Sequence, residues 1–132
     1  MWLVNARSEE TIASDVNLAL TRAARFQGLL GQDSLDRSAA LVLSPCWSIH
    51  TMFMRFPIDV VFVDRDGRAV RIVRELAPWR IAVAPRAHAA IELSAGSVRA
   101  RDVRIGDELY LVPPALNDPR RAAESRPRPA PS

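Results

Sequence analysis

The chain has no lysine, a single cysteine, only five glycines and no long apolar run. One cysteine excludes an intrachain disulfide and predicts a reducing compartment such as the cytoplasm. So few glycines leave little material for a phosphate-binding loop, and no such motif is present. No segment approaches the roughly 18 apolar residues that a membrane helix needs. The opening MWLVNARSEE also lacks the basic and apolar regions of a secretory signal, so we expect neither a membrane span nor export.

Because lysine is absent, all 18 cationic residues are arginine, and the formal net charge is +3 with a pI of about 10.3. Four arginines and two acids give residues 113–132 a charge of +2, which leaves +1 for residues 1–112. In that first part the arginines alternate with acids and apolar residues, whereas duplex-binding domains concentrate cations on one face. The sequence therefore argues against nucleic-acid binding.

The length of 132 residues suits one hydrophobic core. Most of the ten prolines lie in residues 113–132, where Leu116 is the only large aliphatic residue. Such a segment buries too little apolar surface to offset its ordering entropy. We expect a single domain over residues 1–112 and a disordered, Pro/Arg-rich tail over residues 113–132.

Short apolar runs separated by turn residues predict a mainly β fold. Asp66 and Gly67 stand in the turn of a clear β-hairpin, and Thr21 is placed to cap a helix over residues 22–30 that Gly31 closes. The expected strands are residues 2–4, 16–20, 39–43, 60–63, 69–73, 79–84, 89–93 and 108–112. Six to eight short strands with one helix favour a compact antiparallel sandwich or barrel.

The segment of residues 46–67, CWSIHTMFMRFPIDVVFVDRDG, places polar side chains in a stretch that is otherwise typical of buried strands. A buried donor, acceptor or charge without a partner costs about 1 to 3 kcal/mol or more, so His50 and Asp59 each need one. They could bond to each other, to the backbone or to a ligand. A hydrogen bond between the two would satisfy both and would act as a structural staple inside the β core.

If residues 49–53 are extended, His50, Met52 and Met54 share one face. Thioethers adapt to varied ligand shapes, and an exposed tryptophan is often a binding anchor. The candidate ligand-binding residues are therefore His50, Met52, Met54, Arg55, Asp59 and Trp79.

Cys46 offers a different reading, in which His50 activates the thiol as a nucleophile and Asp59 orients the imidazole. At strand rise, four residues separate the two α-carbons by roughly 13 Å, so this arrangement requires a bend. His88 and Glu92 complete the list of possible metal ligands, but no ligand doublet of known spacing occurs. Glu92 stands between Ile91 and Leu93 and should point away from whatever they pack against. We assign no metal site, cofactor or catalytic residue.

Several segments resemble the DUF192 family of small prokaryotic proteins, which has no established activity. These are RFQGLL at residues 25–30, SIHTMFMRFPIDVVFVDRDGRAVRIV at residues 48–73, AAIELSAG at residues 89–96 and IGDEL at residues 105–109. The resemblance spans roughly residues 15–112, and its central pattern falls on His50, Met54, Pro57 and Asp59. It implies a compact, mainly β sandwich or barrel with a short helix, and it fixes the fold better than the function.

Three function classes follow. The leading hypothesis is a small binding module with a polar pocket around His50 and Asp59, for a small anionic or peptide ligand. The second is an enzyme, either hydrolase-like through Cys46 and His50 or metal-assisted through His50 and Asp59. The third is a partner subunit that docks through Trp79 and the tail. Solvent-reachable, convergent side chains would favour a site, whereas full burial with mutual bonds would favour the staple. The oligomeric state is left open.

Overall fold

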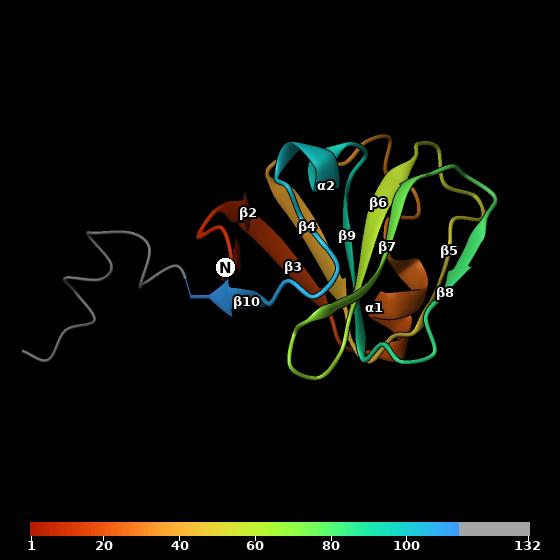
Figure 1. Cartoon of the computed structure of the whole chain (residues 1–132). Coiled ribbons are helices and arrows are strands. Elements are labelled where there is room, and N and C mark those ends of the chain that lie inside the picture. The colour runs from red at the N-terminus through yellow and green to blue at the C-terminus, as the bar shows by residue number, and fades with distance from the viewer. Residues whose placement is uncertain (114–132) are drawn as a thin grey trace, which may run out of the picture.

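A computed structural model describes residues 1–113, which form ten β-strands and two short helices (Figure 1). The elements are β1 (Trp2–Asn5), β2 (Thr11–Ala13), β3 (Asp15–Ala19), α1 (Arg22–Gln27), β4 (Ala39–Leu43), β5 (Ser48–His50), β6 (Ile58–Val63), β7 (Ala69–Leu76), β8 (Ile81–Val83), β9 (Ala89–Ser94), α2 (Ser97–Ala100) and β10 (Leu109–Val112). The predicted mainly β class is confirmed. Among the described residues no sheet closes into a barrel, so the fold is sandwich-like.

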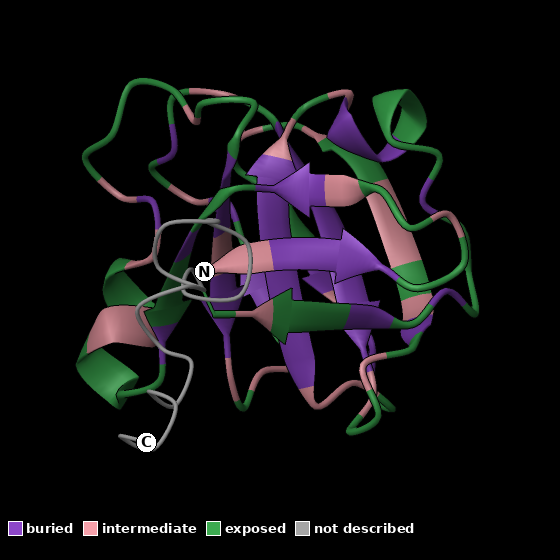
Figure 2. Cartoon of the chain, turned by 90° about the vertical axis from the view of Figure 1, so that its left-hand side faces the viewer, coloured by how far each residue is buried: buried purple, intermediate pink, exposed green. Residues whose placement is uncertain are grey.

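A five-stranded sheet, in the order β3-β4-β9-β6-β7, forms the middle layer of the molecule. The three-stranded sheet β10-β1-β2 lies on one side of it, and α1 with the two-stranded sheet β5-β8 lies on the other (Figure 1). Both faces of the middle sheet are therefore covered, and every residue of β6 is buried. Figure 2, seen from the three-stranded sheet, shows the buried strands behind it. This double burial explains why β6 and β9 are almost continuous apolar runs.

The antiparallel pairing of β6 with β9 divides their side chains between two cores. Residues directly opposite each other share a face, and Asp59 pairs with Leu93 while Val60 pairs with Glu92. Leu93 belongs to the core beneath the three-stranded sheet, and Val60 belongs to the core beneath α1 and β5. Asp59 and Glu92 therefore point to opposite faces of the middle sheet.

The predicted hairpin and the helix cap at Thr21 are confirmed, since the Thr21 hydroxyl accepts a hydrogen bond from the Ala24 amide at 3.1 Å. The helix ends at Gln27 rather than at residue 30, because Gly28 adopts a φ of 45° and caps it. The expected extension of residues 49–53 is wrong. β5 ends at His50, and the chain turns at Phe53, whose φ is 64°. One pair of strands also departs from the antiparallel pattern. β3 and β4, which are connected in the chain by α1, pair in parallel.

Asp59 ties three elements together from inside the first core. Its carboxylate is fully buried and accepts backbone N–H bonds from Glu75 in β7 at 2.8 Å and from Val98 in α2 at 2.9 Å. Glu75 has a φ of 49°, and the β6–β7 register shifts between Ile58 and Val60, so the carboxylate supports an irregular part of the ladder. The sequence left three kinds of partner open for Asp59: His50, the backbone or a ligand. In the structure its partners are backbone amides.

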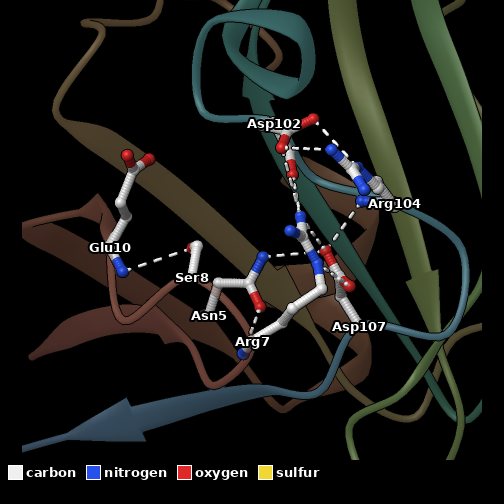
Figure 3. Close-up of polar contacts among 7 residues, drawn as sticks. All are labelled: Asn5, Arg7, Ser8, Glu10, Asp102, Arg104 and Asp107. Atoms are coloured by element: carbon white, nitrogen blue, oxygen red, sulfur yellow. Dashed lines mark hydrogen bonds and ion pairs between the residues drawn. The ribbon is translucent and has the colours of Figure 1, made fainter.

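A second polar network joins the beginning of the described chain to its end (Figure 3). The buried Asp107 carboxylate accepts hydrogen bonds from the Asn5 side-chain amide at 2.8 Å and from Arg7 Nε at 2.7 Å. It also accepts a hydrogen bond from the Arg104 backbone amide at 2.8 Å. The Arg7 guanidinium, which is the largest influence, lowers the pKa of Asp107 to about 2, and the bonds from Arg104 and Asn5 act in the same direction. This network holds β1 beside the segment that leads into β10.

The predicted tail, residues 113–132, lies outside the described residues except for Pro113. In the part of the chain that is described, no helix is long and apolar enough to cross a membrane.

Replacing Asp59 with asparagine should destabilise the protein. The amide keeps one acceptor oxygen but turns an NH2 group toward a backbone N–H, and such an unsatisfied buried donor costs about 1 to 3 kcal/mol. Urea unfolding of D59N should show that loss, while D66N, which alters an exposed turn residue, should stay within about 0.5 kcal/mol of wild type. Equal stabilities for D59N and D66N would contradict the anchoring role.

Asp107 should make stability sensitive to acid. Its folded-state pKa lies below the ordinary value of 3.8, so its contribution is present above pH 3.8 and is lost as the pH falls toward 2. That shift corresponds to about 2 kcal/mol. Urea unfolding between pH 2 and pH 6 should show the gap between wild type and D107N narrowing as the pH falls. A gap that stays constant would contradict this account.

Candidate functional site

Glu92 is a buried acid in the central strand β9. Its side chain is 4% exposed, and it lies on the face of the middle sheet that α1 and β5 cover. Directly opposite it stand Val60 of β6 and Leu41 of β4, both apolar. The Oε2 atom is buried and has no hydrogen-bond partner among the described residues. An unpaired buried carboxylate oxygen is expensive, so it requires an explanation beyond packing.

Burial raises the pKa of Glu92 to about 7, because the apolar surroundings disfavour the charged form. The carboxyl group therefore exchanges between its neutral and charged forms at a pH well above the usual range of a glutamic acid. No arginine of the described chain forms an ion pair with it. Buried acids with strongly raised pKa values are concentrated at functional sites.

A cavity of about 240 Å³ opens beside Glu92 between α1, β5 and the middle sheet. It is lined by Arg25, Phe26, Gln27, Gly28, Leu29, Leu30, Leu43, Cys46, Ser48, Ile49, His50, Met54 and Glu92. We call it the Glu92 pocket. Most of its side chains are apolar, and a few polar groups converge on it, which is typical of small-molecule sites.

The Cys46 thiol forms part of the pocket wall without being activated. Its Sγ–H donates to the Ser48 carbonyl at 3.1 Å, and the Cys46 amide donates to the His88 carbonyl at 2.8 Å. Burial raises the pKa of Cys46 and the Glu92 charge adds to that rise, while the Ser48 hydrogen bond and Arg25 oppose it. Reactive cysteines need a lowered pKa, so the thiol lacks the activation that a hydrolase nucleophile requires.

Arg25 reaches the pocket from α1 and is held by backbone carbonyls. Its Nη1 atom donates to the Leu20 carbonyl at 2.8 Å and to the Ser44 carbonyl at 3.4 Å. The guanidinium therefore fastens the helix to the chain before β5 while forming part of the pocket wall. His50, at the end of β5, is exposed and lines the pocket, and the buried Met54 lies deeper.

The structure thus brings together two of the predicted ligand-binding residues, His50 and Met54, with Cys46. The expected His50–Asp59 pair is wrong. Asp59 points into the opposite core and bonds to backbone amides, because the register of β6 on β9 fixes its face. For the same reason the two residues cannot act together on a nucleophile or a metal ion. Within residues 1–113, no three or more acidic, cysteine or histidine side chains are grouped to hold a metal.

The other predicted residues lie outside the pocket. Met52 is partly buried but does not line it, and Arg55 forms an exposed ion pair with Asp33 at 2.5 Å. Trp79 is 53% exposed and packs against Phe53, with ring centroids 4.6 Å apart and the ring planes tilted by 58°. This pair lies on loops that Thr51 ties together, since its buried hydroxyl donates to the Ala77 carbonyl at 2.6 Å.

From the sequence, Glu92 was predicted only as a possible metal ligand. The prediction that Glu92 points away from the packing of Ile91 and Leu93 is confirmed, and the face to which it points belongs to a second core. The signal that could have identified Glu92 as buried is its place inside AAIEL. This run is too apolar for a strand that has one face in contact with solvent.

Comparisons with known proteins agree with this fold. Residues 3–111 match the model of the DUF192 family, described as "Uncharacterized ACR". A UPF0127 protein of Thermococcus sibiricus is 31% identical over 113 residues, which cover 81% of this chain and 72% of that protein. A UPF0127 protein of Pyrococcus furiosus is 30% identical over 81% of this chain and 95% of its own length.

Two crystal structures resemble the chain in fold. One, a protein of unknown function from Novosphingobium aromaticivorans, has a TM-score of 0.75 and 18% identity, with 84% of each chain covered. The other, from Sinorhizobium meliloti, has a TM-score of 0.72 and 24% identity, covering 83% of this chain and 89% of that one. At such low identities these structures support the fold alone. The family match over residues 3–111 goes further: this chain belongs to the DUF192 family, a family of uncharacterised function.

Proposed function

We propose that the chain is a small binding module whose ligand occupies the Glu92 pocket. The single observation that carries this proposal is the Glu92 side chain, which lines a cavity and whose buried Oε2 atom has no hydrogen-bond partner among the described residues. A ligand with a donor group would satisfy it. The proposal replaces the predicted polar pocket around His50 and Asp59 with one formed by Cys46, His50 and Glu92.

The size and lining of the pocket support a small ligand. Its volume of about 240 Å³ lies below the roughly 300 to 1,000 Å³ of pockets for drug-sized molecules. Leu29, Leu43 and Ile49 supply apolar walls, and Cys46, His50 and Glu92 supply polar groups. A small metabolite fits this description better than an extended peptide.

The hydrolase alternative has less support. The Cys46 thiol donates a hydrogen bond to the Ser48 carbonyl rather than to His50, and burial raises its pKa. Docking of a partner through Trp79 and the tail depends largely on residues outside the described chain, so it stays a prediction, as do the single-domain organisation and the cytoplasmic location.

A fragment screen with matched variants at Cys46 tests the binding function. C46F places a large side chain in the pocket, whereas C46A leaves the pocket open. Fragments should raise the melting temperature of wild type and C46A, because binding only the folded state stabilises it, and should leave C46F unchanged. In two-dimensional NMR spectra of wild type, the same fragments should shift the amide signals of the pocket.

A second readout needs no variant. Fragments in the pocket should slow the alkylation of Cys46 by iodoacetamide. The proposal is wrong if no fragment shifts the NMR signals of the pocket. It is also wrong if the fragments that bind raise the melting temperature of C46F as much as that of C46A and leave the rate of Cys46 alkylation unchanged.

If Glu92 serves ligand binding at a cost in stability, the free energy of unfolding should depend on pH in a characteristic way. Glu92 has its pKa raised from 4.5 to about 7, so the unfolded chain binds fewer protons than the folded chain between these values. Its contribution to stability therefore falls as the pH rises through this window, by about 3 kcal/mol in total.

Replacing Glu92 with glutamine removes this titration. The stability of E92Q relative to wild type should increase by about 3 kcal/mol between pH 4.5 and pH 8, measured by urea unfolding. E10Q, which changes an exposed acid, should follow wild type at every pH. Parallel curves for E92Q and wild type would show that Glu92 has no raised pKa.

A further inference from the structure

We infer that the ligand of the Glu92 pocket carries a protonated primary amine on a short aliphatic body, with the ammonium group against the Glu92 carboxylate. This inference rests on the proposed binding function and names the chemical class of the ligand. It is carried by the charge and hydrogen-bonding state of the groups that surround the pocket.

The pocket contains an acid without a cationic partner. Oε2 of Glu92 is buried and accepts no hydrogen bond within the described chain. Arg25, the only arginine in the lining, uses Nη1 for the carbonyls of Leu20 and Ser44, and it forms no ion pair with Glu92. An ammonium group supplies both the missing charge and three hydrogen-bond donors.

Ligands of the opposite kind fit less well. A carboxylate or phosphate placed in the same cavity would lie beside Glu92, and two like charges in a poorly solvated site repel each other strongly. A neutral alcohol could donate one hydrogen bond to Oε2 but would leave the carboxylate charge unbalanced. Of these groups, only the ammonium satisfies the donor requirement and the charge requirement together.

The rest of the pocket accommodates an aliphatic body. Leu29, Leu30 and Leu43 line it, together with the buried Ile49 and Met54. Two sources share this chemistry, a simple alkylamine and an amino acid. In the second case the wall formed by Arg25 would also meet a carboxylate.

Binding should be coupled to proton release. The titratable and charged groups that line the pocket with Glu92 are Cys46, His50 and Arg25, while β4 and β6 present the apolar Leu41 and Val60 opposite it. An ammonium group beside Glu92 favours the ionised carboxylate, so near the raised pKa of about 7 binding should release a fraction of a proton. The affinity for the amine should therefore rise between pH 6 and pH 8.

Calorimetric titration with three ligands of matched shape tests the inference. We expect 3-methylbutylamine to bind wild type at least tenfold more tightly than 3-methylbutanol or 3-methylbutanoate at pH 8. E92Q should lose at least tenfold in affinity for the amine, while the exposed-site control E10Q should bind it as wild type does. Titrations at pH 7 in phosphate and in Tris, whose ionisation enthalpies differ, measure the released proton. Leucine is the fourth ligand, and tighter binding than the amine would support an amino acid as the source.

The outcomes separate this inference from the binding function. If the alcohol or the carboxylate binds as tightly as the amine, or if E92Q keeps the amine affinity, the ammonium ligand is wrong although the pocket still binds. If none of these four ligands binds, the inference is also wrong, and the fragment screen with C46F and C46A decides the binding function by itself. Amine binding that releases no proton at any pH between 5 and 8 would likewise overturn it.

Discussion

The pairing of β6 with β9 at the centre of a doubly covered sheet places two carboxyl groups where water cannot solvate them. Asp59, on one face, receives backbone amides from Glu75 and Val98 and so fixes β7 and α2 in place. Glu92, on the other face, is left with an unpaired oxygen beside a cavity. One buried acid is thus explained by structure, and the other calls for a ligand.

The difference between the two acids follows from what covers each face. The face of Asp59 meets α2 and the irregular end of β7, where backbone N–H groups have no ladder partner and can turn inward. The face of Glu92 meets α1 and β5, and no backbone amide of the described residues donates to its Oε2 atom. Since α1 is fastened by Arg25 to the carbonyls of Leu20 and Ser44, the wall of the pocket is built from the same contacts that position the helix.

Much of the architecture could be predicted because it is encoded locally. Thr21 caps the helix as expected, and turn residues mark the β6–β7 hairpin. The candidate site could be predicted only in part, because it depends on which strands pair and in which register. Alternation shows that Glu92 opposes its chain neighbours, but only the pairing shows that Asp59 and Glu92 lie on opposite faces. His50 and Glu92 line the same cavity although more than forty residues of chain separate them, and this leaves no local trace in the sequence.

The Asn5–Asp107 hydrogen bond spans 102 residues, and β1 pairs with β10 over residues 109–112. β1 is synthesised long before β10, so its edge toward β10 is unpaired at first. That edge stays unpaired until nearly all of the described chain has been synthesised. Contacts of such long range slow folding, because the entropy of closing the loop is lost before the contact forms. During this interval β1 is an open strand edge and a point of vulnerability to misassembly with other nascent chains.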